Sequence, residues 1–437
     1  MELVMIRQLY VVIALLAILC ILQLDQVRKK VWKLWKSFKG FVNRVLHWIP
    51  FYLVRLFPRD RKLVLFGADD GNIFSGNPKY LFLEAQKHPE IRAVWIAKNK
   101  DVVKSIRKQG FEAYMSNSKE GRWLQLRAKT LIHSHSIKED FTYMLVSGAT
   151  SVNTWHGVGL KRSWFRNTNS FAGKWMMEPR SLKRSYQMLW ATTNMPKKTY
   201  VIATSEEVAE YYPVTYNVGP ENIINLGQAR NDVFYDDSLE EGELPKCFKN
   251  GKVIVYMPTH RDYGDKKGVA EEIGYNIDYD KLSAVLEKYG YTFVIKQHRW
   301  NTSAGRRMNY KNIVDISSQN YSLDTQMLLK YTDILITDYS SVYTDYLLLD
   351  RPVVFYCYDL DEYLAKWELN FDYDYVTPGP QCFNSDELIA ALEKLMQGQD
   401  EYEAERQRVK NVFYSPENQQ PVAAKQMDYI INNIIKP

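Results

Sequence analysis

The chain has 437 residues, of which 46% are hydrophobic and 25% are charged. This composition is typical of a globular protein and excludes an intrinsically disordered chain. The length indicates two or three domains, because a single core rarely exceeds about 250 residues. The net charge of +6 is concentrated in residues 26–44, which contain seven basic side chains and no acidic one. The remainder is therefore nearly neutral, which argues against a broad nucleic-acid-binding surface.

The four cysteines are scattered without CxxC spacing. They predict neither a zinc site nor a disulfide framework, and they fit a reducing compartment.

The N-terminal segment predicts attachment to a membrane. Residues 9–24 form an apolar run interrupted only by Gln23, which is short for a span of about 20 residues. Extending the run back to Leu3 reaches that length if Arg7 snorkels to the interface, so residues 3–24 could span the bilayer or lie in it. A signal peptide is the alternative, but no clear small-x-small cleavage site follows Leu22. Because basic residues follow the run, the positive-inside rule places residue 26 onward on the cytoplasmic side of the cell membrane.

Residues 31–49 predict a basic amphipathic helix. Apolar side chains recur every three or four residues from Val31 to Ile49, with lysine and arginine at many of the other positions. This pattern is typical of a helix that lies in an anionic membrane surface, and the alternative is a helix packed on the protein core. We expect residues 1–57 to contain a hydrophobic helix and a basic amphipathic helix that anchor the chain.

From Lys62 onward, short apolar runs alternate with helical patterns, which indicates an α/β fold with parallel sheets. In the first half, strands are expected at 63–66, 93–97, 130–133, 151–154 and 201–204, and helices at 77–87 and 102–108. In the second half, strands are expected at 253–257, 291–296, 313–316, 334–337 and 353–356, and helices at 279–289 and 386–396. We expect domains at 58–225 and 226–437, with a last helix at about 422–435.

A polar turn at residues 338–341 lies between the strand at 334–337 and a helix that carries Val342 and Tyr346. This βαβ unit places the turn at the carboxyl end of a parallel strand, where open α/β sheets bind ligands. The hydroxyls of Ser340 and Ser341 and the N–H groups at the helix start would form a seat for an anion. The alternative is that both serines only cap the helix.

Four further motifs accompany this turn: Trp155-His156-Gly157, Gly227-Gln228-Ala229-Arg230-Asn231-Asp232, Pro258-Thr259-His260-Arg261-Asp262 and Lys296-Gln297-His298. With these motifs in this order, residues of about 60–415 resemble the CDP-glycerol glycerophosphotransferase family, the TagB/TagF-like enzymes of teichoic acid and related polymer synthesis. The resemblance implies a GT-B fold, in which an N-terminal Rossmann-like acceptor domain and a C-terminal Rossmann-like CDP-polyol domain face a cleft. In such folds the C-terminal helix, here at about 422–435, crosses back to brace the first half. It also implies transfer of a polyol phosphate from a CDP carrier to an acceptor hydroxyl, with release of CMP. No cofactor is expected.

Two histidines are the expected catalytic residues. His156 matches the histidine taken as the base in the family, and histidine titrates near neutral pH, which suits proton removal from an alcohol. Val158-Gly159 stands where the family usually has Thr-Pro, which leaves the rigidity of this turn open. His298 resembles the second histidine of the family, expected at the donor phosphates or the leaving group, although Arg299 stands where proline is common. Either histidine could instead be a structural residue at a strand end.

The expected substrate-binding residues are polar groups near strand ends. Arg261 suits bidentate contact with phosphate, and Arg230 could reach the pyrophosphate across the cleft. For both arginines the alternative is a surface role, and Ala229 replaces a family proline beside Arg230. Asp338 is expected to orient its loop or to accept a hydrogen bond from the polyol. The full set is Arg230, His260, Arg261, Lys296, Asp338, Ser340 and Ser341.

An irregular stretch at residues 161–184 is rich in basic and aromatic side chains and could clamp a phosphate-bearing, lipid-linked acceptor. The alternative is a solvated basic face. Gly157, Lys161 and Arg162 are the expected acceptor-side residues. His133 and His135 could form a metal pair, but the sequence offers no evident third ligand, so no metal is expected.

We therefore expect a membrane-attached enzyme that uses CDP-glycerol or CDP-ribitol, a lipid-linked saccharide acceptor and an anionic membrane surface. It would act as a primase, which the compact length slightly favours, or as a polymerase, either as a homo-oligomer or with other polymer-synthesis enzymes. One alternative is a GT-B glycosyltransferase that uses a nucleotide sugar. Another is a non-catalytic membrane scaffold, which would have no need of His156, Arg230, His298 and Ser340 together.

Overall fold

The computed structural model describes residues 2–177, 181, 198–240, 244–249, 251–259, 276–297, 309–317 and 324–436. It divides into two compact parts, residues 1–56 and 57–437. His260, Arg261 and His298, three of the expected site residues, lie outside the described ranges.

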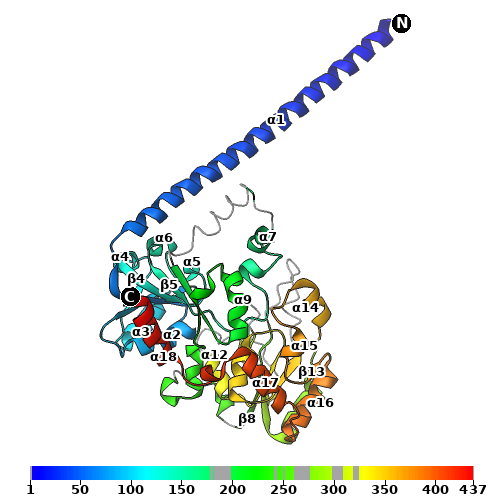
Figure 1. Cartoon of the computed structure of the whole chain (residues 1–437). Helices are drawn as coiled ribbons and strands as arrows, with labels where there is room; N and C mark the ends of the chain where they lie inside the picture. The colour runs from blue at the N-terminus through cyan, green and yellow to red at the C-terminus, as the bar shows by residue number, and fades with distance from the viewer. Residues whose placement is uncertain are drawn as a thin grey trace. The chain divides into compact units, whose positions relative to one another are not determined.

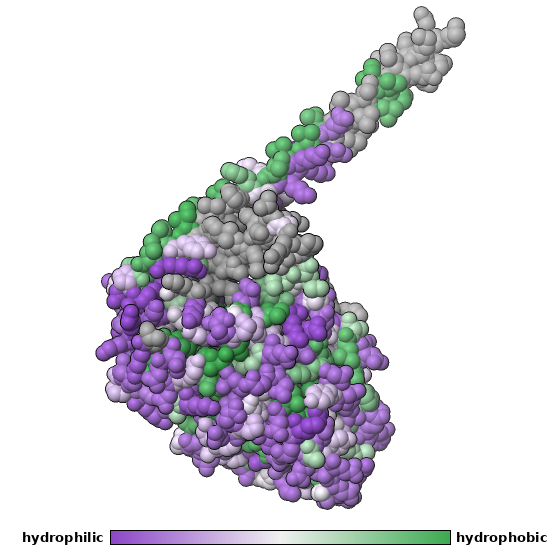
Figure 2. Space-filling view, in the orientation of Figure 1, coloured by the Kyte–Doolittle hydropathy of each residue, from purple (hydrophilic) through white to green (hydrophobic). Residues whose placement is uncertain are grey.

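The first part contains helix α1 (Glu2–Leu53) (Figure 1). Two successive helices were expected here, but the structure has one, because neither proline nor glycine occurs between residues 20 and 39 to interrupt it. Among the side chains of this helix that the structure describes, many hydrophobic ones are exposed (Figure 2), with Leu34 at 70% and Phe38 at 64%. Within the described ranges, no helix combines the length and the apolarity that crossing a bilayer requires.

The second part begins with a seven-stranded sheet in which neighbouring strands are parallel, in the order β3-β2-β1-β4-β5-β6-β7 (Figure 1). Its strands are β1 (Asp60–Gly67), β2 (Arg92–Ala97), β3 (Ala113–Met115), β4 (Ala128–His133), β5 (Thr150–Asn153), β6 (Lys198–Ala203) and β7 (Ile223–Asn225). Its helices are α2 (Gly76–Ala85), α3 (Lys100–Lys108), α4 (Lys119–Arg127), α5 (Ile137–Asp140), α6 (Tyr143–Val146), α7 (Phe171–Met177) and α9 (Glu206–Tyr216). The expected strands are confirmed, whereas β3 and β7 escaped prediction because each has only three residues.

A six-stranded parallel sheet follows, in the order β10-β9-β8-β11-β12-β13. Its strands are β8 (Lys252–Tyr256), β9 (Tyr291–Ile295), β10 (Ile313–Asp315), β11 (Ile334–Thr337), β12 (Val353–Tyr356) and β13 (Gln381–Cys382). The helices here are α11 (Tyr279–Tyr289), α12 (Thr325–Lys330), α13 (Val342–Tyr346), α14 (Leu360–Lys366), α15 (Tyr373–Val376), α16 (Ser385–Met396), α17 (Glu403–Phe413) and α18 (Ala423–Ile430). The α/β fold with two parallel sheets is thus confirmed.

Local chemistry explains the limits of a helix such as α11. The Asp278 side chain accepts a hydrogen bond from the backbone N–H of Lys281, which caps the first turn. The helix ends at Gly290, whose φ of 71° belongs to the left-handed region that glycine adopts without strain.

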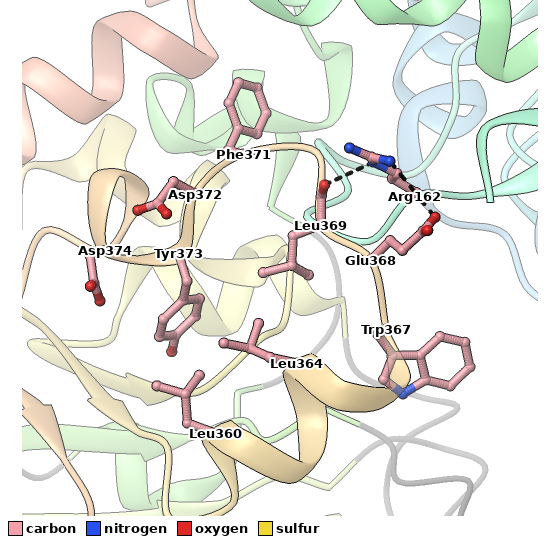
Figure 3. A pocket seen from close by; sticks show the side chains of 10 residues that line it. All are labelled: Arg162, Leu360, Leu364, Trp367, Glu368, Leu369, Phe371, Asp372, Tyr373 and Asp374. Atoms are coloured by element: carbon pink, nitrogen blue, oxygen red, sulfur yellow. Dashed lines mark hydrogen bonds and ion pairs between the residues drawn. The ribbon is translucent and has the colours of Figure 1, made fainter. Parts of the chain in front are cut away.

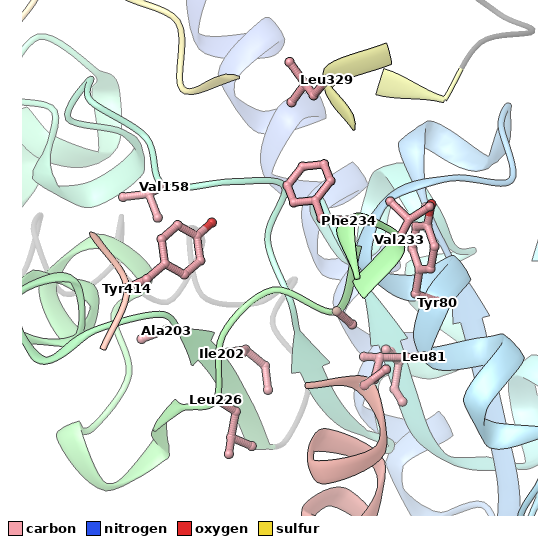
Figure 4. Packing of buried hydrophobic residues seen from close by; sticks show 14 of the residues in the cluster. Tyr80, Leu81, Val158, Ile202, Ala203, Leu226, Val233, Phe234, Leu329 and Tyr414 are labelled. Atoms are coloured by element: carbon pink, nitrogen blue, oxygen red, sulfur yellow. The ribbon is translucent and has the colours of Figure 1, made fainter. Parts of the chain in front are cut away.

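The core runs through both sheets. Val253 and Val255 of β8 belong to the same buried cluster as Val64 of β1, whereas Ile254 and Tyr256 pack on the opposite face of the second sheet. Such burial on both faces is the rule for parallel strands. In Figure 4, Val233 and Phe234 of the connection between the sheets lie in this shared cluster, close to Tyr80 of α2.

The C-terminal end of the chain returns to the first sheet, as expected. Helix α18 packs against α2, and the Asp232 carboxylate accepts hydrogen bonds from the N–H groups of Val422 and Ala423, both at 2.8 Å. Burial raises the pKa of Asp232 to about 6. The two halves are therefore joined by the connection between the sheets and by the last helix.

Both sheets have a switch point at which the strand order reverses, between β1 and β4 in the first and between β8 and β11 in the second. Ligands of open parallel sheets bind beyond the carboxyl ends of the strands at such points. The loops after these four strands are therefore where a site is expected.

Candidate active site

A cavity of about 470 Å³ lies between the two halves of residues 57–437. First-half residues come from the loops that follow β1, β4 and β5, and Arg230 comes from the connection between the sheets. Second-half residues come from the loops that follow β9 and β11 and from the beginnings of α12 and α13. The side chains that line it and carry polar groups are Asp69, Ser75, Ser134, His135, His156, Arg230, Lys296, Asp324, Thr325, Gln326, Ser340, Ser341 and Asp345. His156, Arg230, Lys296, Ser340 and Ser341 were predicted from the sequence, and the fold brings all five to one cavity.

His156 follows β5 and is half-buried. Its Nδ1 lies 3.2 Å from the carbonyl oxygen of Ser134. Because a carbonyl only accepts, Nδ1 is the protonated nitrogen and Nε2 keeps its lone pair. Burial, followed by the positive fields of His135 and Arg230, lowers the pKa of His156 to about 3. The imidazole is therefore neutral at physiological pH and able to accept a proton at Nε2.

The backbone before His156 is strained. Trp155 has a φ of 53°, which is rare for any residue other than glycine, asparagine or aspartate. Its N–H donates to Oδ1 of Asn153 at 2.9 Å, and its carbonyl accepts from Asn77 Nδ2 at 3.0 Å. Strained residues held in this way are concentrated at functional sites.

Arg230 connects the two halves of the site. Its Nη1 donates to the carbonyl oxygen of His156 at 2.8 Å, and its Nη2 donates to the carboxylate of Asp345. It was expected to bind the donor pyrophosphate directly. In the structure, two of its nitrogens hold the His156 loop in place relative to α13.

Asp345 was not predicted as a site residue. Its buried carboxylate also accepts from Asn231 Nδ2 at 3.2 Å, from Gln326 Nε2 at 2.7 Å and from the hydroxyl of Tyr414. Four donors around one buried carboxylate offset the cost of removing its charge from water. The available sequence clue was that Asp345 is the one charged residue of α13.

Gly157 lies against this bridge. A Cβ atom at this position would lie 2.6 Å from Nη2 of Arg230 and 3.4 Å from Oγ of Ser341, and its φ of 124° also favours glycine. Gly157 therefore lets the His156 loop of the first half approach the serine turn of the second half.

The serine turn begins α13. Ser340 Oγ accepts a long hydrogen bond of 3.3 Å from the N–H of Val342, so it caps the helix weakly. Ser341 occupies the N-cap position but makes no side-chain capping bond. Ser340 therefore acts as a weak helix cap, whereas the side chain of Ser341 does not cap the helix.

Asp338 lies deeper than these serines. It is fully buried, and its Oδ1 accepts from the N–H of Thr259 at 2.9 Å and from the Thr259 hydroxyl at 2.6 Å. It ties the loop after β8 to the loop after β11 and is not among the residues that line the cavity. This position fits the expected role in orienting the loop.

Lys161 and Arg162 lie away from the cavity, where the first half meets residues 367–371. Nε of Arg162 donates to the carbonyl of Leu369 at 3.0 Å, and Nζ of Lys161 lies 4.5 Å from the ring centre of Trp367. Arg162 also borders a second cavity of about 420 Å³, whose walls include Leu360, Leu364 and Tyr373 (Figure 3). Both cations therefore join the two halves of the protein.

His133 is a structural residue. Its Nδ1 lies 2.8 Å from the carbonyl of His135, and its Nε2 lies 2.6 Å from the Ser151 hydroxyl. Both ring nitrogens are thus used inside the first half, and burial lowers the pKa of this side chain to about 4. Among the residues that the structure describes, no group of three or more His, Cys, Asp or Glu side chains is placed to hold a metal ion.

Two further contacts near the cavity were not predicted. Nζ of the buried Lys79 lies 3.2 Å from Oδ2 of Asp324, which places an ion pair between α2 and the start of α12. Asp140, which is fully buried, accepts from the N–H groups of Asp70, Ser134 and His135 at 3.0, 3.2 and 2.9 Å. It therefore holds together two of the loops that line the cavity.

Known proteins are similar to this chain in sequence and in fold. The sequence model of the CDP-Glycerol:Poly(glycerophosphate) glycerophosphotransferase family matches residues 50–432. The chain is 29% identical over 380 residues to the teichoic acid poly(glycerol phosphate) polymerase of Staphylococcus epidermidis, covering 82% of this chain and 49% of that protein. It is 27% identical over 372 residues to the teichoic acid poly(ribitol-phosphate) polymerase of Bacillus spizizenii, covering 81% of this chain and 54% of that one. The chain thus spans about half the length of these two relatives.

A solved structure of a variant of the wall teichoic acid polymerase TagF, soaked with CDPG, has a TM-score of 0.68 and 25% sequence identity to this chain. The superposition covers 90% of this chain and 96% of the other.

Proposed function

Because the chain belongs to the CDP-glycerol:poly(glycerophosphate) glycerophosphotransferase family, we propose that it transfers a polyol phosphate from CDP-glycerol or CDP-ribitol to a hydroxyl of a lipid-linked saccharide acceptor. CMP is the second product. One observation carries the proposal: a neutral imidazole with an oriented lone pair shares a cavity with a lysine and two serine hydroxyls.

In the proposed reaction, the acceptor hydroxyl attacks the phosphorus that bears the polyol. Its proton passes to Nε2 of His156 as the new P–O bond forms, and the bond to the CMP oxygen breaks with its electron pair. Lys296, Ser340 and Ser341 offset the charge that develops on the departing phosphate. Preorganised donors of this kind supply much of the rate enhancement in phosphoryl transfer.

The deciding experiment measures CMP release. Purified full-length protein is given a lipid-linked saccharide acceptor with CDP-glycerol, CDP-ribitol or a nucleotide sugar. We expect CMP only with a CDP-polyol and only with the acceptor present. Turnover of a nucleotide sugar alone would establish the glycosyltransferase alternative, and no turnover with any donor would favour the scaffold.

The length of the product separates a primase from a polymerase. A primase adds one polyol phosphate and then stops, whereas a polymerase yields a ladder of products as the ratio of donor to acceptor rises. The chain has relatives of both kinds, since it is also 25% identical over 289 residues to the teichoic acid glycerol-phosphate primase of Bacillus subtilis.

We also propose that α1 attaches the enzyme to an anionic membrane surface. Val31, Leu34 and Phe38 are 58–70% exposed on one helix that carries seven basic residues within residues 26–44. Nζ of Lys36 lies 4.9 Å from the ring centre of Trp32, and Nζ of Lys39 lies 5.3 Å from that of Trp35. Apolar and aromatic groups interleaved with cations bind anionic lipid interfaces.

Flotation with lipid vesicles tests this attachment. Replacement of Lys33, Lys36 and Lys39 by glutamate is expected to reduce binding to vesicles that contain phosphatidylglycerol. Replacement of Lys100, Lys104 and Lys108, which are exposed on α3, makes the same charge change and serves as the control. Equal binding by both triple variants would refute an electrostatic role for α1.

A further inference from the structure

Asn77 joins the loop of His156 to the connection between the sheets. It lies in the first turn of α2, and it is buried, with 1% of the residue exposed. Its Nδ2 donates to the carbonyl oxygens of Thr154 at 3.1 Å and Trp155 at 3.0 Å, and its Oδ1 accepts from the backbone N–H of Arg230 at 3.0 Å. Because a carbonyl only accepts and a backbone N–H only donates, these partners determine the orientation of the amide.

The two peptide groups that flank His156 are both held by hydrogen bonds. The carbonyl before it, that of Trp155, accepts from Asn77, and its own carbonyl accepts from Nη1 of Arg230 at 2.8 Å. The backbone N–H of Arg230 donates in turn to Asn77, so three hydrogen bonds close a ring through these four residues. Because each peptide group is planar, fixing both groups fixes φ and ψ of His156 and the direction of its Cα–Cβ bond.

These hydrogen bonds act at a strained point of the backbone. Trp155, directly before His156, has a φ of 53°, and a residue keeps such a conformation only when the structure around it holds it there. The side chain of Asn153 holds the N–H of Trp155, and Asn77 holds its carbonyl. Without the amide of Asn77, relaxation of φ at Trp155 would turn the peptide group that leads into His156.

The acceptors of Asn77 depend on its amide. Nδ2 also donates to Oε1 of Gln228, so its two N–H groups are shared among three acceptors. Thr154 and Gln228 are both buried, and a buried acceptor that loses its donor costs free energy. A side chain without an amide would leave these groups to find other donors, which would move residues 154–155.

The imidazole of His156 depends on this placement of its backbone. Its Nδ1 lies 3.2 Å from the carbonyl oxygen of Ser134, at the long end of the range for N–H···O bonds. A small displacement of the His156 backbone would break this contact, and the position of the lone pair on Nε2 would no longer be fixed.

We propose that Asn77 is a positioning residue, which orients His156 for proton transfer by fixing the peptide groups on both sides of it. This inference rests on the proposed function, because that function assigns the base to His156. A misplacement of about 1 Å at a reacting group reduces the rate by about 100-fold, and a loss of that size is expected when the amide is removed.

Two variants of Asn77 test this role through the steady-state kinetics of CMP release. Asn77→Ala removes the whole amide, whereas Asn77→Ser keeps a hydroxyl that ends one atom short of the amide nitrogen and oxygen. We expect kcat to fall by about 100-fold in both. The KM for the CDP-polyol should stay within about threefold, because Lys296, Ser340 and Ser341 belong to the second half. Wild-type kcat in either folded variant would overturn the inference.

Asn418→Ala is the matched control. Asn418 is also buried, and its Nδ2 donates to the carbonyl of Thr204 at 3.0 Å and to Oδ1 of Asn225 at 2.7 Å. It is not among the residues that line the cavity. Its replacement should lower the melting temperature much as Asn77→Ala does, but kcat should stay within about threefold of the wild type. Equal losses of kcat in Asn418→Ala and Asn77→Ala would indicate a purely structural role and overturn the inference.

A spectroscopic measurement separates this inference from the proposed function. In nitrogen NMR of isotopically labelled histidine, the protonated and the unprotonated ring nitrogens have well-separated signals, and His156→Gln identifies those of residue 156. In the wild type, Nδ1 of His156 should be protonated, because it faces the Ser134 carbonyl. In both Asn77 variants the two signals should move toward one another as the ring samples both tautomers, whereas Asn418→Ala should keep the wild-type signals.

Each outcome of this measurement decides between the two ideas. Wild-type signals in both Asn77 variants would refute the role of Asn77, even in an active enzyme. Failure of both variants to fold would also overturn it, because Asn77 would then be required for the fold itself. Shifted signals in the variants of a protein that releases no CMP would instead refute only the proposed function.

Discussion

The two walls of the cavity are built differently. On the first-half wall, His156 and His135 are held by hydrogen bonds to buried groups, namely the Ser134 carbonyl and the Asp140 carboxylate. On the second-half wall, Ser341 makes no capping bond and Ser340 makes only a long one. A base must meet a proton with its lone pair aligned, whereas attraction between charges falls slowly with distance. The wall that we propose for proton transfer is therefore held by buried groups, and the wall that we propose for phosphate binding keeps hydroxyls available for a ligand.

The largest effect is expected when the imidazole of His156 is removed from the first-half wall. His156→Ala should reduce turnover by about 10² to 10⁴-fold, the usual contribution of a general base, while the dissociation constant for CDP-glycerol stays within about threefold. Steady-state CMP release and calorimetric titration measure the two quantities. His88→Ala is the control, because His88 lies near Glu84 and Glu90, away from the cavity. Normal turnover in His156→Ala would remove the assignment of the base.

The next largest effect is expected when the ion pair between Arg230 and Asp345, which connects the two walls, is removed. Asp345→Asn leaves the Arg230 guanidinium without its counter-ion, which should lower the free energy of unfolding by about 3 kcal/mol. Misplacement of the His156 loop should lower turnover by about 100-fold. Urea unfolding and CMP release give the two values. The matched control is Asp386→Asn, which removes a carboxylate that is 79% exposed in an ion pair with Lys281. Wild-type turnover in a folded Asp345→Asn protein would refute the link.

A smaller effect is expected when a side chain at residue 157 pushes the two walls apart. Gly157→Ala places a methyl group 2.6 Å from Nη2 of Arg230 at a left-handed φ, so we expect turnover to fall by about tenfold. Gly159→Ala is the control in the same loop, because its nearest neighbour beyond the adjacent residues, the Lys161 carbonyl oxygen, would be 3.8 Å away. Equal turnover in the two variants would contradict the close approach at residue 157.

A still smaller effect is expected when one serine hydroxyl is removed from the second-half wall. Ser341→Ala removes one hydroxyl at the phosphate seat and should weaken donor binding by about 1.5 kcal/mol, the value of a hydrogen bond to a charged group. The KM for the CDP-polyol should rise by about tenfold with little change in kcat. Ser105→Ala, at an exposed position on α3, is the control. A fall in kcat at constant KM would instead place Ser341 in the chemical step.

The last prediction concerns stability rather than turnover, and it involves the buried His133. The pKa of His133 is lowered to about 4 in the folded protein and is about 6.5 when unfolded. The unfolded chain therefore takes up a proton between pH 6.5 and pH 4 that the folded protein does not, so acidification favours unfolding by about 3 kcal/mol. Burial raises the pKa of Asp140 to about 7, which contributes with the opposite sign. The free energy of unfolding in urea should therefore be measured against pH for the wild type and for His133→Asn. The variant should lose less stability between pH 6.5 and pH 4, and parallel curves for the two proteins would refute the prediction.

Much of this protein was predictable from local patterns. Runs of apolar residues predicted the strands, and polar residues that follow them, such as His156, Lys296 and Ser341, line one cavity in the structure. This works because parallel strands end at one edge of a sheet, so that the position of such a residue depends on its own strand. The return of the last helix to the first half was expected from the resemblance to a GT-B family and not from a local pattern.

Only the tertiary structure decided which groups hold these residues. Asp345 contacts Arg230, 115 positions away, and Lys79 pairs with Asp324, 245 positions away, so no local pattern reports either pair. Lys161 and Arg162 share the basic character of a phosphate clamp, yet packing places them against residues 367–369. The strand period and residue type are local properties of the chain. The partners of a buried charge depend on how distant segments meet, and that is determined only when the two halves close around a shared core.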